Sequence, residues 1–231
     1  QKTTQGNVTG FAMCCLQNEE GTFNFTPWLW STGATSYDIN NDNGIKALTL
    51  VKDLVDAGSM SKEVINWTQG DVMNQFISGN IAMMVNGPWQ VPTMREQAPD
   101  LNWDVTLLPK DAEYASCLGG ENFGVIDGDN VDAALDFLQF ATSKDEVASY
   151  IDDFGYIAAR KDVAEGQFTD DETMQKFTEE MQYAQPRGPH AQWPEISDAL
   201  SLAVNESITG TSTPADAAAK AQSTIDSILA E

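Results

Sequence analysis

Apolar residues recur at helical spacing along much of the chain. Ile45, Leu48, Val51, Leu54 and Val55 fall on one face of a predicted helix, which Gly58 ends. Similar stripes predict helices at residues 72–77, 131–141 and 174–181, the last capped by Asp170, and two more close the chain. Thr26 and Pro27 resemble the cap and first residue of a short helix that ends at Gly33.

Short apolar runs between these stripes have the length of strands. They cover residues 8–16, 81–85, 103–108 and 123–126. Strands that alternate with helices predict an α/β fold.

The run from Ile81 to Val85 is followed by Asn86-Gly87-Pro88-Trp89. Asn-Gly breaks the strand, and Pro88 suits the first position of a helix because a helix needs no N–H there. Trp89 would then lie beside free backbone N–H groups, an arrangement that suits a polar ligand with apolar faces, such as a sugar. Simple core packing of Trp89 explains the same pattern.

Composition narrows the functional classes. The 231 residues hold 12 basic and 35 acidic side chains, a formal charge of −23, which disfavours nucleic acid and anionic lipid as partners. The acidic residues are spread along the chain and indicate solubility. The three cysteines make no disulfide framework and are best explained as small buried hydrophobes. No phosphate-binding glycine loop or zinc spacing occurs, so we expect no cofactor and no metal.

Several motifs in order resemble one protein family. Residues 76–89 are similar to its pattern "F..G..AM...GPW", Val105–Pro109 to "v..lP", Leu118–Val125 to "GG...gi", and Trp193–Leu200 to "W.ei...l". These motifs resemble the extracellular solute-binding proteins of carbohydrate ABC importers, the maltose-binding-protein-like group. The resemblance implies a type II periplasmic-binding-protein fold with two lobes, one nearly complete and the other only partly present.

The resemblance also implies a division of the chain. Residues 1–116 and 189–231 would form the C-terminal lobe, and residues 117–188 would form part of the N-terminal lobe with the crossing segments. The opening residues Gln1–Thr4 resemble the middle of a family member, which implies an absent N-terminal portion. We therefore expect residues 117–185 to expose apolar surface, or to be covered by another chain through self-association.

The resemblance and the local chemistry together select the candidate ligand-binding residues. Sugars are bound by aromatic rings on their C–H faces and by polar side chains on their hydroxyls. The candidates are Trp28, Trp30, Trp89, Gly120, Glu121, Asn122, Arg187, His190 and Trp193.

Structural roles remain open for several of these candidates. One of Trp28 and Trp30 is expected to face the cleft and the other the core, because residues two apart cannot share a helix face. Turn formation would also account for Gly120–Asn122. A structural role would also account for His190, and a clamp near the crossing segment would account for Arg187.

The leading functional prediction is non-catalytic binding of a sugar or oligosaccharide, outside the cytoplasm, for delivery to a membrane permease. Its localisation would be periplasmic, or cell-surface anchored through an absent N-terminal segment. The alternatives are a receptor for a peptide, polyamine or metal complex, and a glycoside hydrolase that uses Glu121 and Glu195. A hydrolase needs two carboxylates across one glycosidic bond, and neither glutamate has an obvious apolar setting.

Overall fold

The computed structural model describes residue 4 and residues 6–231. Residues 1–3, on which the expectation of an absent N-terminal portion partly rests, lie outside the described residues. The described chain forms two compact units. The first contains the residues up to Asn86, Leu107–Leu118 and Glu180–Glu231, and the second contains Gly87–Thr106 and Gly119–Glu179.

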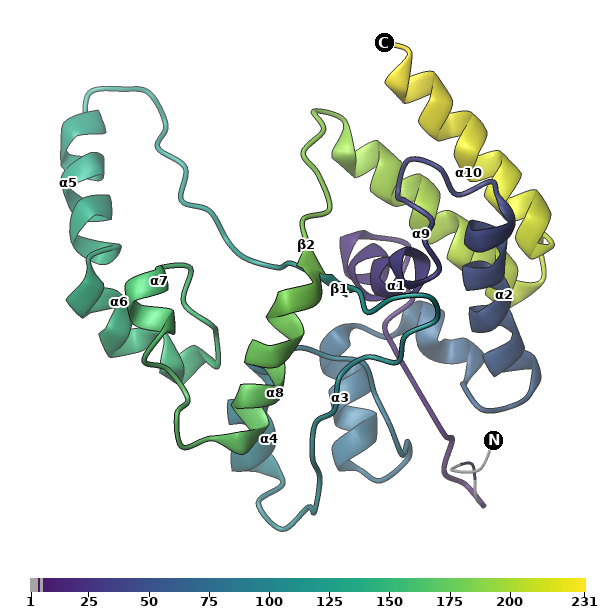
Figure 1. Cartoon of the computed structure of the whole chain (residues 1–231), viewed down its shortest axis with the longest axis horizontal. Coiled ribbons are helices and arrows are strands. Elements are labelled where there is room, and N and C mark those ends of the chain that lie inside the picture. The colour runs from purple at the N-terminus through teal and green to yellow at the C-terminus, as the bar shows by residue number, and fades with distance from the viewer. Residues whose placement is uncertain (1–3, 5) are drawn as a thin grey trace. The chain divides into compact units, whose positions relative to one another are not determined.

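The first unit is built mainly from helices. They are α1 (Glu19–Ser31), α2 (Asp42–Asp56), α3 (Gln69–Ile77), α9 (Trp193–Thr209) and α10 (Pro214–Leu229), with short 3₁₀ turns η1 (Lys62–Asn66) and η4 (Met181–Tyr183). Figure 1 shows α1, α2, α9 and α10 gathered into one group. Their apolar stripes supply the core, including Phe25, Leu48, Leu200 and Ile225, each fully buried.

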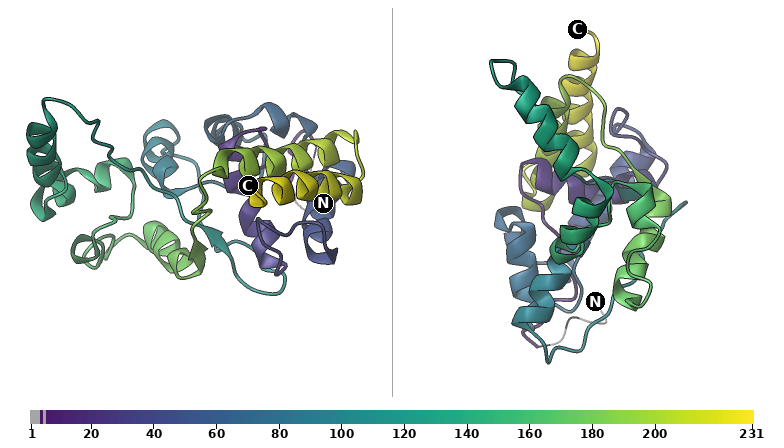
Figure 2. Two further views of the ribbon diagram at one scale, coloured as in Figure 1. Left: turned by 90° about the horizontal axis from the view of Figure 1, so that it is seen from above. Right: turned by 90° about the vertical axis from the view of Figure 1, so that its left-hand side faces the viewer.

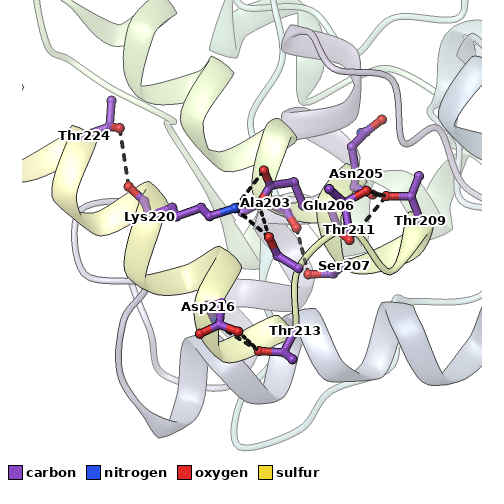
Figure 3. Close-up of polar contacts among 11 residues, drawn as sticks. Ala203, Asn205, Glu206, Ser207, Thr209, Thr211, Thr213, Asp216, Lys220 and Thr224 are labelled. Carbon is purple, nitrogen blue, oxygen red and sulfur yellow. Dashed lines mark hydrogen bonds and ion pairs between the residues drawn. The ribbon is translucent and has the colours of Figure 1, made fainter.

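Helices α9 and α10 lie side by side in both further views (Figure 2). Gly210 ends α9 in the left-handed conformation, at φ 77°, which a residue without Cβ adopts freely. Thr213 then caps α10 by accepting a hydrogen bond from Asp216 N–H. Lys220 of α10 donates to Glu206 of α9 and to Ser212, and these contacts close the turn (Figure 3).

Helix α1 is longer than the sequence predicts. It begins at Glu19 with Asn18 as its N-cap, so Pro27 lies inside it and the predicted cap at Thr26 is wrong. Pro27 has no N–H for the carbonyl of Phe23, four residues earlier. The Thr26 hydroxyl donates to that carbonyl at 3.3 Å, which satisfies the acceptor and lets the helix continue.

Extended segments replace the predicted first strands. Residues 9–12 and 80–85 run parallel through two isolated bridges, Thr9–Ile81 and Ala12–Met84. Ile81 is buried but Met83 is 48% exposed, so the predicted strand at 81–85 is only partly covered.

Two short strands pair at a third place, within the first unit. β1 (Ser116–Cys117) and β2 (Ala184–Gln185) pair in parallel, and Leu118 N–H extends the pairing to Gln185 O at 2.8 Å. The strands predicted at 103–108 and 123–126 are absent from the described residues. A strand forms only beside a hydrogen-bonded neighbouring strand. The run 123–126 has no such neighbour in the part of the chain that the structure describes, and Ile126 is 91% exposed to solvent.

The second unit contains the short turn η2 (Pro88–Gln90), helices α4 (Val91–Gln97), α5 (Val131–Ala141), α6 (Lys144–Tyr150), α7 (Lys161–Ala164) and α8 (Glu172–Glu180), and the turn η3 (Asp152–Phe154). Asp171, not the predicted Asp170, caps α8 by accepting from Met174 N–H. No residue of α5 is buried, and Leu135, Phe137 and Phe140 are each more than half exposed. The prediction of exposed apolar surface within residues 117–185 is therefore confirmed.

The units differ from the predicted division in three segments. Residues 117–118 and 180–188 group with the first unit, although the sequence places them in the other lobe. Gly87–Thr106 groups with Gly119–Glu179, although the sequence places it with the first lobe. A bidentate ion pair holds it there: Arg95 of α4 binds both carboxylate oxygens of Asp171, at 2.8 and 2.9 Å. Compact units are defined by contacts, and the assignment of segments to lobes stays a prediction.

Candidate functional site

The first turn of α1 carries two carboxylates, Glu19 and Glu20. Acidic side chains are favourable there because the free N–H groups give the helix N-terminus a partial positive charge. Glu20 accepts from the backbone N–H of Gln69 at 2.9 Å. Glu19 instead meets side chains from the C-terminal part of the chain.

The Glu19 carboxylate receives three donors. Arg187 pairs with it at 2.5 Å, and the Trp193 indole N–H donates to its two oxygens at 3.0 and 3.1 Å. The Ser197 hydroxyl of α9 is the third donor. The guanidinium of Arg187 also lies 4.6 Å from the centre of the Phe23 ring, a cation–π contact. Arg187 thus connects α1 with the segment that precedes α9 within this unit, and its predicted roles as a ligand contact or a clamp near the crossing stay predictions.

An aromatic cluster surrounds Trp193. Tyr37 meets Trp193 edge to face, with ring centres 6.4 Å apart, and meets His190 at the same separation. His190 accepts the Gln192 backbone N–H at Nδ1, so the neutral imidazole carries its proton on Nε2 as a donor. All three rings are partly exposed. The cluster therefore combines apolar ring surface with polar edges, the chemistry that a sugar requires.

Trp28 and Trp30 are separated as the helix geometry predicts. Trp30 is 7% exposed within the core, and its indole N–H donates to Ser36 at 3.1 Å. A side chain so placed offers little surface to a ligand, so we remove Trp30 from the candidate site. Trp28 is half-buried and meets Phe11 edge to face at 5.8 Å, and its buried Nε1 has no acceptor among the described residues.

Trp89 lies in η2 of the second unit and is half-buried. Its indole folds back over Gly87, where an added Cβ would lie 2.1 Å from two ring carbons. Glycine at position 87 therefore permits the ring's orientation.

A second glycine, Gly155, lets another loop pack closely against the turn that carries Trp89. Gly155 has a φ of 67°, and a Cβ there would lie 2.6 Å from the Pro88 carbonyl oxygen and 2.8 Å from the Pro92 ring. The segment around Tyr156 thus packs on the start of the turn that carries Trp89.

Gly120, Glu121 and Asn122 are exposed in the second unit. Gly120 has a φ of 147°, which favours glycine. Glu121 approaches the Tyr156 hydroxyl: burial chiefly raises the pKa of Tyr156, and the charge and hydrogen bond of Glu121 raise it further. Sequence reasoning missed Tyr156 because no motif marks it.

The structure thus brings together Arg187, His190 and Trp193 in the first unit, and adds Glu19, Tyr37 and Ser197 to them. The signal for Glu19 was the cap-and-acid pattern Asn18-Glu19-Glu20, which marks a helix start. Trp89, Gly120, Glu121 and Asn122 belong to the second unit, as does the added Tyr156.

Other kinds of site find little support. Among the described residues, no three or more His, Cys, Asp or Glu side chains are placed to hold a metal ion. Glu121 and Glu195 are both exposed, unlike the general acid of a hydrolase, which needs an apolar setting. Within the described range, no helix is long and apolar enough to cross a bilayer. A shallow hollow of about 580 Å³ at the α9–α10 turn contains none of the candidate residues, and its Lys220 is already paired.

Comparison with known structures defines the class of fold. The chain superposes with a TM-score of 0.83 on an ABC transporter solute-binding protein of Thermotoga lettingae bound to α-D-tagatose, at 25% identity over 96% of this chain and 60% of that one. The GacH receptor of Streptomyces glaucescens, known in complex with acarbose, gives 0.81 at 25% identity over 97% and 60%. Maltose-bound MalE3 of T. maritima shares the fold, with a TM-score of 0.82 at 22% identity over 96% of this chain and 61% of that one. The fold is thus the type II two-lobe fold of periplasmic sugar-binding proteins, of which the chain carries a part.

Sequence comparison gives the family. Residues 1–176 match the model of the bacterial extracellular solute-binding protein family. Binding proteins of Brucella abortus and Brucella suis are 27% identical over 207 residues, which is 84% of this chain and 50% of theirs. The chain belongs to the bacterial extracellular solute-binding protein family, and it spans about half the length of these curated relatives.

Proposed function

We propose that the chain forms part of a receptor that binds a neutral sugar or oligosaccharide and delivers it to the permease of an ABC importer. The observation that carries the proposal is the Trp193 ring, which is partly exposed, held at its edge by Glu19 and packed against Tyr37, which also meets His190. Stacking a sugar on one aromatic face contributes about 1–3 kcal/mol, roughly a ten- to hundredfold gain in affinity.

The charge arrangement favours a neutral ligand over a cation. Glu19, the carboxylate nearest the ring, is already paired with Arg187 at 2.5 Å and hydrogen-bonded to Trp193. A polyamine or a metal complex would have to compete with a guanidinium for it. A sugar needs only the ring faces and the donors and acceptors at their edges.

The structures that share the fold give this proposal further support. The Thermotoga lettingae protein at 25% identity was solved with α-D-tagatose, and the Streptomyces glaucescens receptor with acarbose. With this role we also propose docking on a permease and a location outside the cytoplasm, either in the periplasm or anchored to the cell surface.

Titration calorimetry of the intact protein with tagatose, maltose and longer neutral oligosaccharides tests the proposal. We expect saturable heat with at least one sugar and a ten- to hundredfold loss of affinity in Trp193→Ala. Trp103→Ala is the matched control, because Trp103 belongs to no cluster described above. Incubation with the bound sugar should release no shorter product, whereas product formation would favour the hydrolase alternative.

A further inference from the structure

Glu19 receives its hydrogen-bond donors from two segments that both lie far from it along the chain. Arg187 follows β2, while Trp193 and Ser197 belong to the first turns of α9. Glu19 itself is on α1, whose first turn is fixed by the Asn18 cap. One carboxylate therefore connects the start of α1, the segment after β2 and the start of α9.

The hydrogen bond to Trp193 restricts the ring more than packing alone would. The indole N–H lies in the ring plane, so a bond at 3.0–3.1 Å to the two carboxylate oxygens fixes the direction of the ring's edge. Tyr37 meets the same ring edge to face and limits its tilt. With its edge and its tilt set, the ring presents a defined face.

The carboxylate is held from its other side. Arg187 is paired with Glu19 and rests on Phe23, itself a residue of α1, so the guanidinium is fixed independently of Trp193. The Ser197 hydroxyl bridges Glu19 and Thr22, whose Oγ1 is 2.9 Å away. Arg187 and Ser197 thus hold the Glu19 carboxylate independently of the indole, although the Glu19 side chain remains 46% exposed.

We propose that Glu19 is a positioning residue that sets the orientation of the Trp193 ring for ligand stacking, while Arg187 neutralises its charge. This inference rests on the proposed sugar-binding function. It assigns to Glu19 an effect on affinity that acts through Trp193, and an effect on the Trp193 indole that exists without any ligand.

The test compares Glu19→Gln with the wild type, since glutamine keeps the shape but loses the charge and one acceptor oxygen. In ¹⁵N-labelled protein without ligand, with the Trp193 indole resonance assigned by Trp193→Phe, we expect the indole proton to move upfield in Glu19→Gln. We expect sugar affinity to fall about tenfold, the usual difference between a charged and a neutral hydrogen bond. Far-UV circular dichroism should be unchanged, and Glu19→Asp should recover part of the affinity.

Glu20→Gln is the matched control, because Glu20 lies in the same helical turn and binds Gln69 and Cys14 instead. It should leave both the Trp193 resonance and the sugar affinity unchanged. If the wild type binds sugar and Glu19→Gln binds it equally well, the positioning role is overturned while the proposed function stands. If the wild type binds none of the sugars, the proposed function fails and this inference fails with it.

Discussion

The indole of Trp89 rests directly on Gly87, two residues earlier in the chain. A Cβ at position 87 would lie 2.1 Å from two carbons of the ring, far inside van der Waals contact. Because the obstacle is a side chain, a larger residue at 87 would displace the ring and leave the backbone in place.

Gly87→Ala should therefore reorient Trp89 without unfolding the protein. We expect the near-UV circular dichroism spectrum to change. If Trp89 contacts the ligand, the affinity for sugar should also fall about tenfold. Gly124→Ala is the control, since a Cβ there meets no atom within 4 Å. An unchanged near-UV spectrum in Gly87→Ala would contradict the contact.

Gly155→Ala should destabilise the second unit. Its φ of 67° is strained for a residue with Cβ, and the nearest obstacle is the backbone oxygen of Pro88 at 2.6 Å. Left-handed strain alone costs about 1–2 kcal/mol, and the clash adds to it. Urea denaturation should show this loss, whereas Gly128→Ala, in open space, should differ little from the wild type.

The ion pair of Arg95 and Asp171 predicts a dependence of stability on pH. The hydrogen bond from Arg95 chiefly lowers the pKa of Asp171 below its ordinary value of 3.8. A carboxyl whose pKa is lower in the folded state stabilises the fold above about pH 4 and loses that contribution as the pH falls through the folded-state pKa. In Asp171→Asn, the loss of unfolding free energy between pH 5 and about pH 2 should be smaller than in the wild type. Equal pH profiles would show that the pair contributes nothing to stability.

The cysteines should be unreactive in the folded protein. Burial chiefly raises the pKa of Cys14 to about 12 and that of Cys117 to about 11, and burial also raises the pKa of Cys15. Since the thiolate is the reactive form, alkylation by iodoacetamide near pH 8 should be slow. All three thiols should react in urea. Rapid modification of Cys14 without denaturant would contradict its burial.

The exposed side chains of α5 predict self-association of this chain. Leu135, Phe137 and Phe140 are 51%, 59% and 58% exposed, and Phe137 and Phe140, three residues apart, share one face of the helix. Sedimentation velocity should show a mass that rises with concentration, and Phe137→Gln with Phe140→Gln should reduce the effect. A monomer at all concentrations would leave this prediction without support.

The sequence predicts the helices better than the strands, for a physical reason. The stripe from Ile45 to Val55 specifies α2 because helical hydrogen bonds are local. The run 123–126 has strand-like composition but needs a partner from elsewhere, and sequence spacing does not reveal one. Pro27 misled the prediction of α1, since its effect depends on whether the Thr26 hydroxyl replaces the lost donor.

For the candidate site, the sequence indicated the aromatic residues but not what holds them. Trp193 was found from its motif, whereas Glu19 lies 174 positions away in the chain and meets it only in the fold. Trp28 and Trp30 could be separated onto different faces by helix geometry, but only the structure shows that Trp30 is the buried one, 7% exposed and bonded to Ser36.

The central claim is that a neutral sugar stacks on Trp193 without being chemically changed. Calorimetric titration of the intact wild-type protein and of Trp193→Ala with the same sugar tests it most directly. The account predicts saturable binding by the wild type, at least tenfold weaker binding by the variant and recovery of the sugar intact. Equal affinity in the two proteins would contradict it.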